Sequence, residues 1–226
     1  VNRDVSPTNV VLTFAGQVKL IDFGIAQSAL GFTPQIGQIK GKIAYMSPEQ
    51  VRGLPVDARS DVFSLGVVLH ELLTGRRLFA GDSDFALMEA VRSAPVPAPS
   101  SFNAQVDPAL DALVLRALAR DREQRFPSAG AMAEALRAYR DDRGLSYGEE
   151  DLARYLRESL PLRWAQEEQR RLRLAAAPLP LAAGPAAPYS APLAQAPAPA
   201  PQCGLSLRGQ VLLGLGLGLA ISALLY

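Results

Sequence analysis

The sequence is poor in the two residue types that most often carry nucleophilic or metal chemistry. Cys203 is the only cysteine among 226 residues, and His70 is the only histidine. A single cysteine excludes an intrachain disulfide and a multi-cysteine zinc site. The single histidine argues against catalysis by a Ser-His-Asp triad or a Cys-His pair. Because His70 lies in an apolar run, we expect it to be a packed core residue.

The chain also lacks a charge imbalance. The formal net charge is +1, which gives no global argument for nucleic acid or for an acidic partner. Lysine is rare, with only Lys19, Lys40 and Lys42, and all other basic residues are arginine.

Composition divides the chain into four regions. Residues 1–142 alternate apolar periodic runs with turn signals and predict a packed domain. Residues 143–177 predict a charged, helical juxtamembrane region interrupted by Pro161. Residues 178–208 are rich in Pro and Ala and predict an extended, semi-rigid linker.

The last region, residues 209–226, contains no charged residue and predicts one transmembrane helix. At about 1.5 Å per residue it is about 27 Å long, close to the hydrocarbon thickness of a bilayer. Gly214 and Gly218 form a GxxxG pair that favours a homodimer, although alternating Gly and Leu also produce this spacing by chance. The positive-inside rule predicts a single-pass membrane protein with residues 1–208 in the cytoplasm, because the flanking arginines all precede the span: Arg163, Arg170, Arg171, Arg173 and Arg208.

The opening loop, NRDVSPTN, is dense in polar residues and leads into two short β-rich runs, VVLTF at 10–14 and VKLI at 18–21. A Gly-containing turn between them predicts an antiparallel hairpin. Such a hairpin brings Asp22 back beside Asn9 and the loop that carries Asp4. Carboxylate and amide oxygens of this kind suit Mg²⁺, which keeps waters and substrate phosphates as its other ligands. The alternative is that Asp and Asn are ordinary turn residues here.

Four motifs occur in order: RDxxxxN at 3–9, DFG at 22–24, YMSPE at 45–49 and DVFSLG at 61–66. Together they resemble the protein kinase family, specifically the C-terminal lobe of bacterial, eukaryote-like Ser/Thr protein kinases. The resemblance covers residues 1–142. It implies an α+β fold, a mainly α-helical C-lobe with a short β-hairpin, and the use of ATP and Mg²⁺ on a protein substrate.

The resemblance also assigns roles to single residues. Asp4 is expected to be the catalytic base, and Asn9 and Asp22 are expected to hold Mg²⁺ on the ATP phosphates. Val11 is expected to lie under the adenine ring. Arg3 is expected to receive a phosphate or another anion from the activation segment, residues 22–49.

Further roles from the resemblance concern structure. Glu49 is expected to pair with Arg125, and Asp61 is expected to accept hydrogen bonds from the backbone of the catalytic loop. Asp107 and Ser128 are predicted N-caps of the two later helices of the lobe.

Two departures from the family pattern bear on catalysis. Asn2 stands where the family has His, which removes a ring that packs against Phe23. Ser6 stands where Ser/Thr kinases have a lysine that contacts the γ-phosphate, whereas Lys42 occupies a position that is usually Thr. We interpret this as relocation of the cation, with a solvated surface Lys42 as the equal alternative.

The Gly-rich loop and the paired lysine of the family's N-terminal lobe are not found in this sequence, which predicts a fragment of a longer kinase. Two functions therefore remain open. The first is part of a membrane-anchored Ser/Thr protein kinase, whose isolated fragment is inactive. The second is a non-catalytic, kinase-derived scaffold tethered to the membrane.

Overall fold

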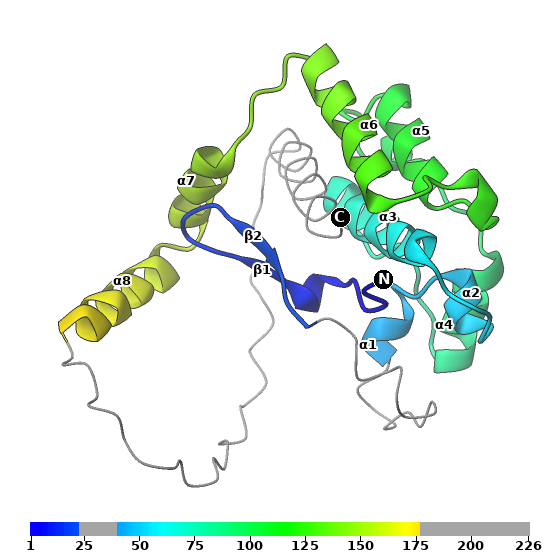
Figure 1. Cartoon of the computed structure of the whole chain (residues 1–226), viewed down its shortest axis with the longest axis horizontal. Helices are drawn as coiled ribbons and strands as arrows, with labels where there is room; N and C mark the ends of the chain where they lie inside the picture. The colour runs from blue at the N-terminus through cyan, green and yellow to red at the C-terminus, as the bar shows by residue number, and fades with distance from the viewer. Residues whose placement is uncertain (23–39, 177–226) are drawn as a thin grey trace, which may run out of the picture.

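The structure is a computed structural model that describes residues 1–22 and 40–176. It is mostly helical with one two-stranded sheet (Figure 1). Its elements in chain order are η1 (Pro7–Asn9), β1 (Val10–Leu12), β2 (Val18–Leu20), α1 (Lys40–Ile43), α2 (Pro48–Val51), α3 (Ala58–Thr74), α4 (Asp84–Ser93), η3 (Pro99–Ser101), α5 (Pro108–Ala117), η4 (Arg122–Gln124), α6 (Ala129–Asp142), α7 (Glu149–Ser159) and α8 (Pro161–Ala176).

The predicted hairpin is confirmed. Strands β1 and β2 pair antiparallel, with Val10 opposite Leu20 and Leu12 opposite Val18. The strands are shorter than the apolar runs, because the chain turns from Thr13 onward: the Gly16 N–H bonds the Thr13 carbonyl at 2.9 Å. Gly16 has φ +83°, a left-handed conformation that glycine adopts without a Cβ penalty.

Helix α3 is the centre of the helical lobe. Every residue from Ser60 to His70 is buried, so this part of the helix is covered on all sides rather than along one apolar stripe. It packs against α5 at close range: a Cβ on Gly66 would lie 3.0 Å from the Cβ of Ala117. Figure 1 shows α5 and α6 lying together over this side of the lobe.

The helix starts follow the capping signals of the sequence. Both predicted N-caps are confirmed, since Asp107 accepts a hydrogen bond from the Leu110 N–H and Ser128 accepts one from the Ala131 N–H. A capped helix start of this kind stabilises the fold by about 0.5–2 kcal/mol relative to alanine.

The charged region after the lobe forms two helices, as its pattern predicts. Helix α7 ends at Ser159 and α8 begins at Pro161. The break falls where the sequence places it, because proline lacks the N–H that a continuous helix needs and is well tolerated in a first turn. In Figure 1, α7 lies beside the turn of the hairpin.

Among the residues the structure describes, no helix combines the length and apolar character needed to span a bilayer. The predicted span at 209–226, its GxxxG pair, the Pro/Ala linker and the Phe23-Gly24 part of DFG lie outside the described residues.

Candidate active site

The opening loop is held by α3 beneath it. Asp61, in the first turn of α3, accepts hydrogen bonds from the backbone N–H groups of Asn2 (2.7 Å) and Arg3 (2.8 Å). Burial raises the pKa of the Asp61 carboxyl above its ordinary value, and these two donors oppose that shift. The predicted hydrogen bonds from the catalytic-loop backbone to Asp61 are therefore confirmed.

The loop adopts an uncommon backbone conformation at Arg3, where φ is +71°. Such a conformation at a non-glycine residue costs on the order of 1–3 kcal/mol and persists only where its surroundings fix it. Here the Arg3 carbonyl accepts a hydrogen bond from Gln50 Nε2 at 2.9 Å. The Arg3 charge also helps to oppose the upward shift of the Asp61 pKa, and the expected binding of an anion by Arg3 stays a prediction.

Two side chains, those of Asn9 and Lys42, meet at the carboxylate of Asp4. Asn9 Nδ2 donates to the Asp4 carboxylate at 2.9 Å and to the Asp4 carbonyl at 2.8 Å. Lys42 Nζ lies 2.5 Å from the same carboxylate oxygen. The Asp4 side chain is 10% exposed and that of Lys42 is 38% exposed, so the pair sits at the edge of the protein surface. The structure therefore places the expected catalytic base in direct contact with Asn9 and Lys42.

The hairpin brings the chain back to Asn9, as predicted. The Ile21 N–H donates to the Asn9 carbonyl at 2.8 Å. Asp22 is the next residue, so its backbone lies close to Asn9. Asp22 is exposed and has φ +61°. The Asn9 amide nitrogen is used by Asp4, which leaves its side-chain oxygen, together with the Asp22 carboxylate, as hard ligands for a cation.

Ser6 cannot supply the missing cation. It is buried, and its hydroxyl lies 2.9 Å from that of Thr8. Lys42 is thus the lysine that contacts the Asp4 cluster. Val11, on the outward side of β1, remains 38% exposed and open to a ligand ring.

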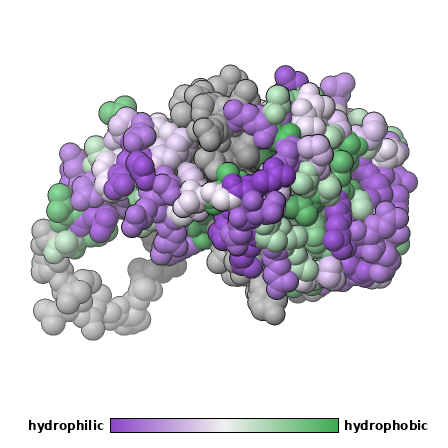
Figure 2. All heavy atoms as spheres, turned by 90° about the horizontal axis from the view of Figure 1, so that it is seen from above, coloured by the Kyte–Doolittle hydropathy of each residue, from purple (hydrophilic) through white to green (hydrophobic). Residues whose placement is uncertain are grey.

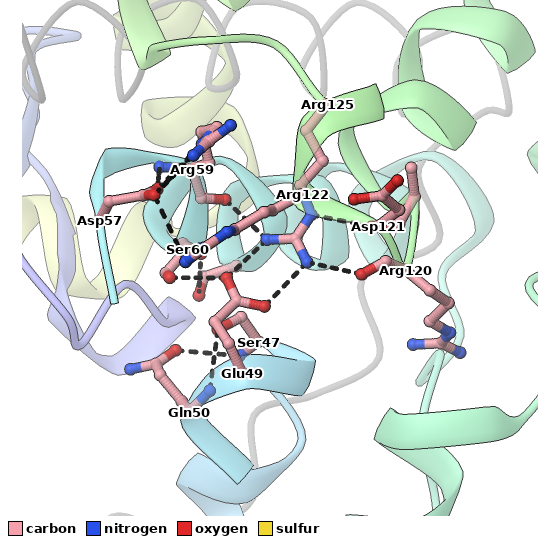
Figure 3. A network of polar contacts seen from close by, with 12 residues as sticks. Ser47, Glu49, Gln50, Asp57, Arg59, Ser60, Arg120, Asp121, Arg122 and Arg125 are labelled. Atoms are coloured by element: carbon pink, nitrogen blue, oxygen red, sulfur yellow. Dashed lines mark hydrogen bonds and ion pairs between the residues drawn. The ribbon is translucent and has the colours of Figure 1, made fainter. Parts of the chain in front are cut away.

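A buried ion pair ties the end of the activation segment to the helical lobe (Figure 3). Arg125 donates to both carboxylate oxygens of Glu49, at 2.7 and 2.9 Å, and the Ser60 hydroxyl donates to the same group at 2.6 Å. Burial disfavours the charged carboxylate, but the hydrogen bonds from Arg125 and Ser60 outweigh it and lower the pKa of Glu49 from 4.5 to about 2. The predicted Glu49–Arg125 pair is confirmed.

Sequence reasoning missed the part played by Gln50. It closes a capping box with Ser47 at the start of α2, through the Ser47 N–H at 2.9 Å and the Gln50 N–H at 3.3 Å, while its Nε2 holds the Arg3 carbonyl. The spacing Ser-x-x-Gln is a known capping-box signature and was available in the sequence. Its contact with the opening loop, 47 residues away, has no local signal.

His70 has the packing role that its apolar surroundings predict. It is buried in α3, and its Nε2 lies 3.0 Å from the Pro97 carbonyl oxygen. Burial lowers the pKa of the imidazole, which keeps it neutral at physiological pH.

Comparison with known proteins agrees with this geometry. The family model described as "Protein kinase domain" matches residues 1–137. The tyrosine-protein kinase MasK of Myxococcus xanthus is 42% identical over 140 residues, 62% of this chain and 22% of its own length. The serine/threonine-protein kinase PknB of Mycolicibacterium smegmatis is 47% identical over 145 residues, 62% of this chain and 23% of its own. A probable serine/threonine-protein kinase of Streptomyces coelicolor is 46% identical over 145 residues, 62% of this chain and 21% of its own.

A helical lobe, a short hairpin and an opening loop that carries Asp4 and Asn9 match one lobe of a protein kinase domain. The chain belongs to the protein kinase family, and its relatives group it with the bacterial, eukaryote-like serine/threonine protein kinases. It spans about a fifth of the length of the curated relatives that it matches.

Proposed function

We propose that the chain carries the catalytic half of a serine/threonine protein kinase, which transfers the γ-phosphate of ATP to a protein hydroxyl. The observation that carries this proposal is the convergence of Asp4, Asn9 and Lys42, with Asp22 delivered beside them by the hairpin. Phosphoryl transfer needs positioning and charge stabilisation more than covalent chemistry, and this cluster offers both.

Asp4 is the group that orients the acceptor hydroxyl and takes its proton. Its carboxylate is anchored by Asn9, so it presents a fixed direction to an incoming substrate. Lys42 then turns partly away from Asp4 and faces the transferred phosphoryl group. Its positive charge there replaces that of the lysine that the family has at the position of Ser6. This is the relocated cation of the sequence analysis, and the 2.5 Å contact supports it.

Asn9 and Asp22 are the residues that would hold Mg²⁺. One carboxylate and one amide oxygen fit an ion that keeps several waters and binds substrate phosphates. When bound, Mg²⁺ neutralises the charge of the nucleotide phosphates.

The family match does not fix which hydroxyl accepts the phosphate, because one relative is named a tyrosine-protein kinase and another a serine/threonine-protein kinase. We propose Ser or Thr. Phosphoamino-acid analysis of a general substrate, such as casein or myelin basic protein, distinguishes the three hydroxyls directly.

The decisive experiment supplies the Gly-rich loop and the paired lysine that this sequence does not contain. The segment of the M. smegmatis relative that precedes its matched region is joined to residues 1–226, and phosphate transfer is measured with Asp4→Asn beside it. Removing a general base typically costs about 10²–10⁴ in rate. The matched control is Asp142→Asn, whose side chain is 80% exposed at the end of α6.

We expect Asp142→Asn to match the unmodified chimera and Asp4→Asn to lose at least about a hundredfold. The unjoined chain should show no ATP-dependent phosphorylation above an Asp22→Ala control. A chimera that folds but transfers no phosphate, or one that tolerates Asp4→Asn, rejects the enzyme and favours the scaffold alternative.

We further propose that residues 209–226 anchor the protein in the membrane once, with the kinase region in the cytoplasm. The support is the uncharged segment and the arginines that precede it. In a bacterial host, the full chain should sediment with membranes and resist extraction by carbonate, whereas a chain ending at residue 208 should not. Recovery of the full chain in the supernatant contradicts the anchor.

A further inference from the structure

Helix α8 lies outside the family match, which ends at residue 137, and it faces the hairpin with one side only. The ring of Trp164 meets that of Phe14 edge to face, with centroids 5.2 Å apart. The residues of α8 that line the cavity beside the hairpin follow the spacing i, i+3, i+4 and i+7, which is one face of a helix: Trp164, Glu167, Glu168 and Arg171. Both acidic residues of α8 are therefore on this inner face.

The opposite face of α8, here called the outer face, is basic. Its residues follow the spacing i, i+4, i+7, i+8 and i+11, and each of them is exposed: Leu162, Gln166, Gln169, Arg170 and Arg173. Arg163 lies at the edge of this face and is exposed as well. Within the part of the chain that the structure describes, Arg163 and Arg173 form no ion pair, and Arg170 has one long pair, 3.8 Å, with Glu167. The outer face thus carries three arginines and no acidic residue.

A face of this composition suits the surface of an anionic bilayer. Helices that lie in the membrane interface combine basic residues with apolar ones that enter the headgroup region. The apolar residues here are Leu162 on the outer face, 80% exposed, and Leu172 and Leu174 on its two sides, 63% and 66% exposed. Arginine side chains add to this, because their methylene stems can be buried while the guanidinium stays among the headgroups.

The position of α8 in the chain favours the same partner. The helix ends at Ala176, and the segment that we propose as the membrane anchor begins at residue 209. Residues 177–208 between them contain a single charged residue, Arg208. Even a fully extended linker of this length, at about 3.1 Å per residue, keeps α8 within about 100 Å of the bilayer. Such a tether raises the effective concentration of the surface, so a weak affinity is sufficient.

We propose that the outer face of α8 binds the anionic lipid surface of the inner leaflet, with the helix parallel to the bilayer. The proposal rests on the proposed function in one respect, the anchor that keeps α8 near the membrane. Arg163, Arg170 and Arg173 face the lipid phosphates, and Leu162 enters between the headgroups. The inner face stays on the hairpin, so this contact also sets how the hairpin is oriented relative to the bilayer. Figure 1 shows α8 at one end of the molecule, away from the helical lobe.

The test measures where α8 lies when the full chain is reconstituted into vesicles. Cys203 is the only cysteine, so Cys203→Ser/Gln166→Cys gives one site on the outer face for an environment-sensitive NBD label. Its emission is compared in vesicles of phosphatidylcholine and in vesicles that contain equal amounts of phosphatidylcholine and phosphatidylglycerol. Nitroxide-labelled lipid in both leaflets is the quencher. We expect a shift to shorter wavelength and quenching in the anionic vesicles, and neither in phosphatidylcholine alone.

A triple variant replaces the three arginines of the outer face by glutamine, which keeps a good helix former at each position. Each arginine near an anionic surface contributes about fivefold to binding, so the ratio of quenched to unquenched label should fall by up to about a hundredfold. The matched control removes the same charge from exposed positions of the helical lobe, Arg52→Gln/Arg92→Gln/Arg137→Gln, and should be quenched as the unmodified chain is. An unchanged emission of Trp164 shows that α8 stays docked on the hairpin in each variant.

Three results overturn the inference. The first is equal quenching in the two kinds of vesicle, and the second is a triple variant that behaves as the control does. The third is a label that responds to a polyanion such as poly(U) but not to anionic vesicles, which assigns the outer face to nucleic acid.

The outcome is separable from that of the proposed anchor, which carbonate extraction reports. If carbonate releases the full chain but the label is still quenched on anionic vesicles, only the anchor is rejected. If the chain resists carbonate and the label stays unquenched, only the surface contact of α8 is rejected. Neither measurement depends on phosphate transfer, so the enzyme proposal is tested independently.

Discussion

The buried Glu49–Arg125 pair gives the sharpest stability prediction. In Glu49→Gln, Arg125 keeps its bonds to the carbonyls of Ala119, Arg59 and Arg120 but loses its counter-charge. Breaking a buried pair by removing one partner costs about 3–5 kcal/mol. A pKa of about 2 in the folded state, against 4.5, gives a stabilisation of the same order, about 3 kcal/mol, by linkage.

A loss of about 3 kcal/mol should lower the midpoint of thermal unfolding by about 6–12 °C in a domain of this size. Circular dichroism at pH 7 measures it. The control is Glu123→Gln, which removes the exposed partner of Arg59 and should change stability by less than about 1 kcal/mol. The reasoning is refuted if Glu49→Gln melts within the range of this control.

The same pair sets a pH dependence. Because the folded-state pKa of Glu49 is lowered, its stabilising contribution is complete above pH 4.5 and is lost as the pH falls toward about 2. The difference in stability between the unmodified chain and Glu49→Gln should therefore shrink across that window. A difference that is constant from pH 5 to pH 2.5 contradicts the assignment of the shift to Glu49.

Two further predictions concern the site and the hairpin. In the active chimera, Lys42→Ala should lower turnover about 10²–10³-fold, by analogy with other lost electrostatic contacts. The double variant Ser6→Lys/Lys42→Thr, which restores the usual arrangement, should recover that turnover. Near-normal turnover in Lys42→Ala would show that Lys42 is a solvated surface lysine instead. Gly16→Ala should displace α7, because the added Cβ would meet the Glu149 backbone and the φ of this residue is positive. The Trp164 emission should then shift to longer wavelength. The control is Gly53→Ala, where φ is also positive but nothing lies near the Cβ, and it should leave that emission unchanged.

Much of the lobe could be predicted because its signals are local. The hairpin follows from two β-rich runs around a glycine turn, and the starts of α5 and α6 follow from Asp107 and Ser128. The Glu49–Arg125 pair spans 76 residues and came only from the family resemblance. Asp4 and Lys42 lie 38 residues apart, and their proximity was likewise expected only from the family resemblance, because no local signal in the sequence indicates it.

The docking of α7 and α8 could not be predicted in the same way. Their sequence shows a charged, amphipathic pattern, which gives helices but does not say what their apolar sides cover. The partner is the far end of the chain, since Phe14 contacts Trp164 across most of the described sequence. This contact does not cover three leucines of α8, since Leu162, Leu172 and Leu174 stay exposed. Hydrophobic residues lie among hydrophilic ones at the left end of the molecule in Figure 2.

The contacts link the buried Glu49–Arg125 pair to the opening loop, so we expect stability and turnover to be coupled in an active chimera. Glu49 and Gln50 are neighbours on α2: the first is fixed by Arg125 and the second holds the carbonyl of Arg3. The uncommon backbone of Arg3 in turn orients Asp4, whose N–H bonds the side chain of Asn2 at 3.1 Å. Loosening the buried pair therefore frees α2 and weakens one of the two restraints on Arg3, the other being Asp61.

In the chimera, Glu49→Gln should accordingly lower turnover at temperatures well below its melting point. Gln50→Ala, which leaves the ion pair intact, should reproduce the loss of turnover without most of the loss of stability. If Gln50→Ala keeps full turnover, Asp61 alone is sufficient to hold the loop.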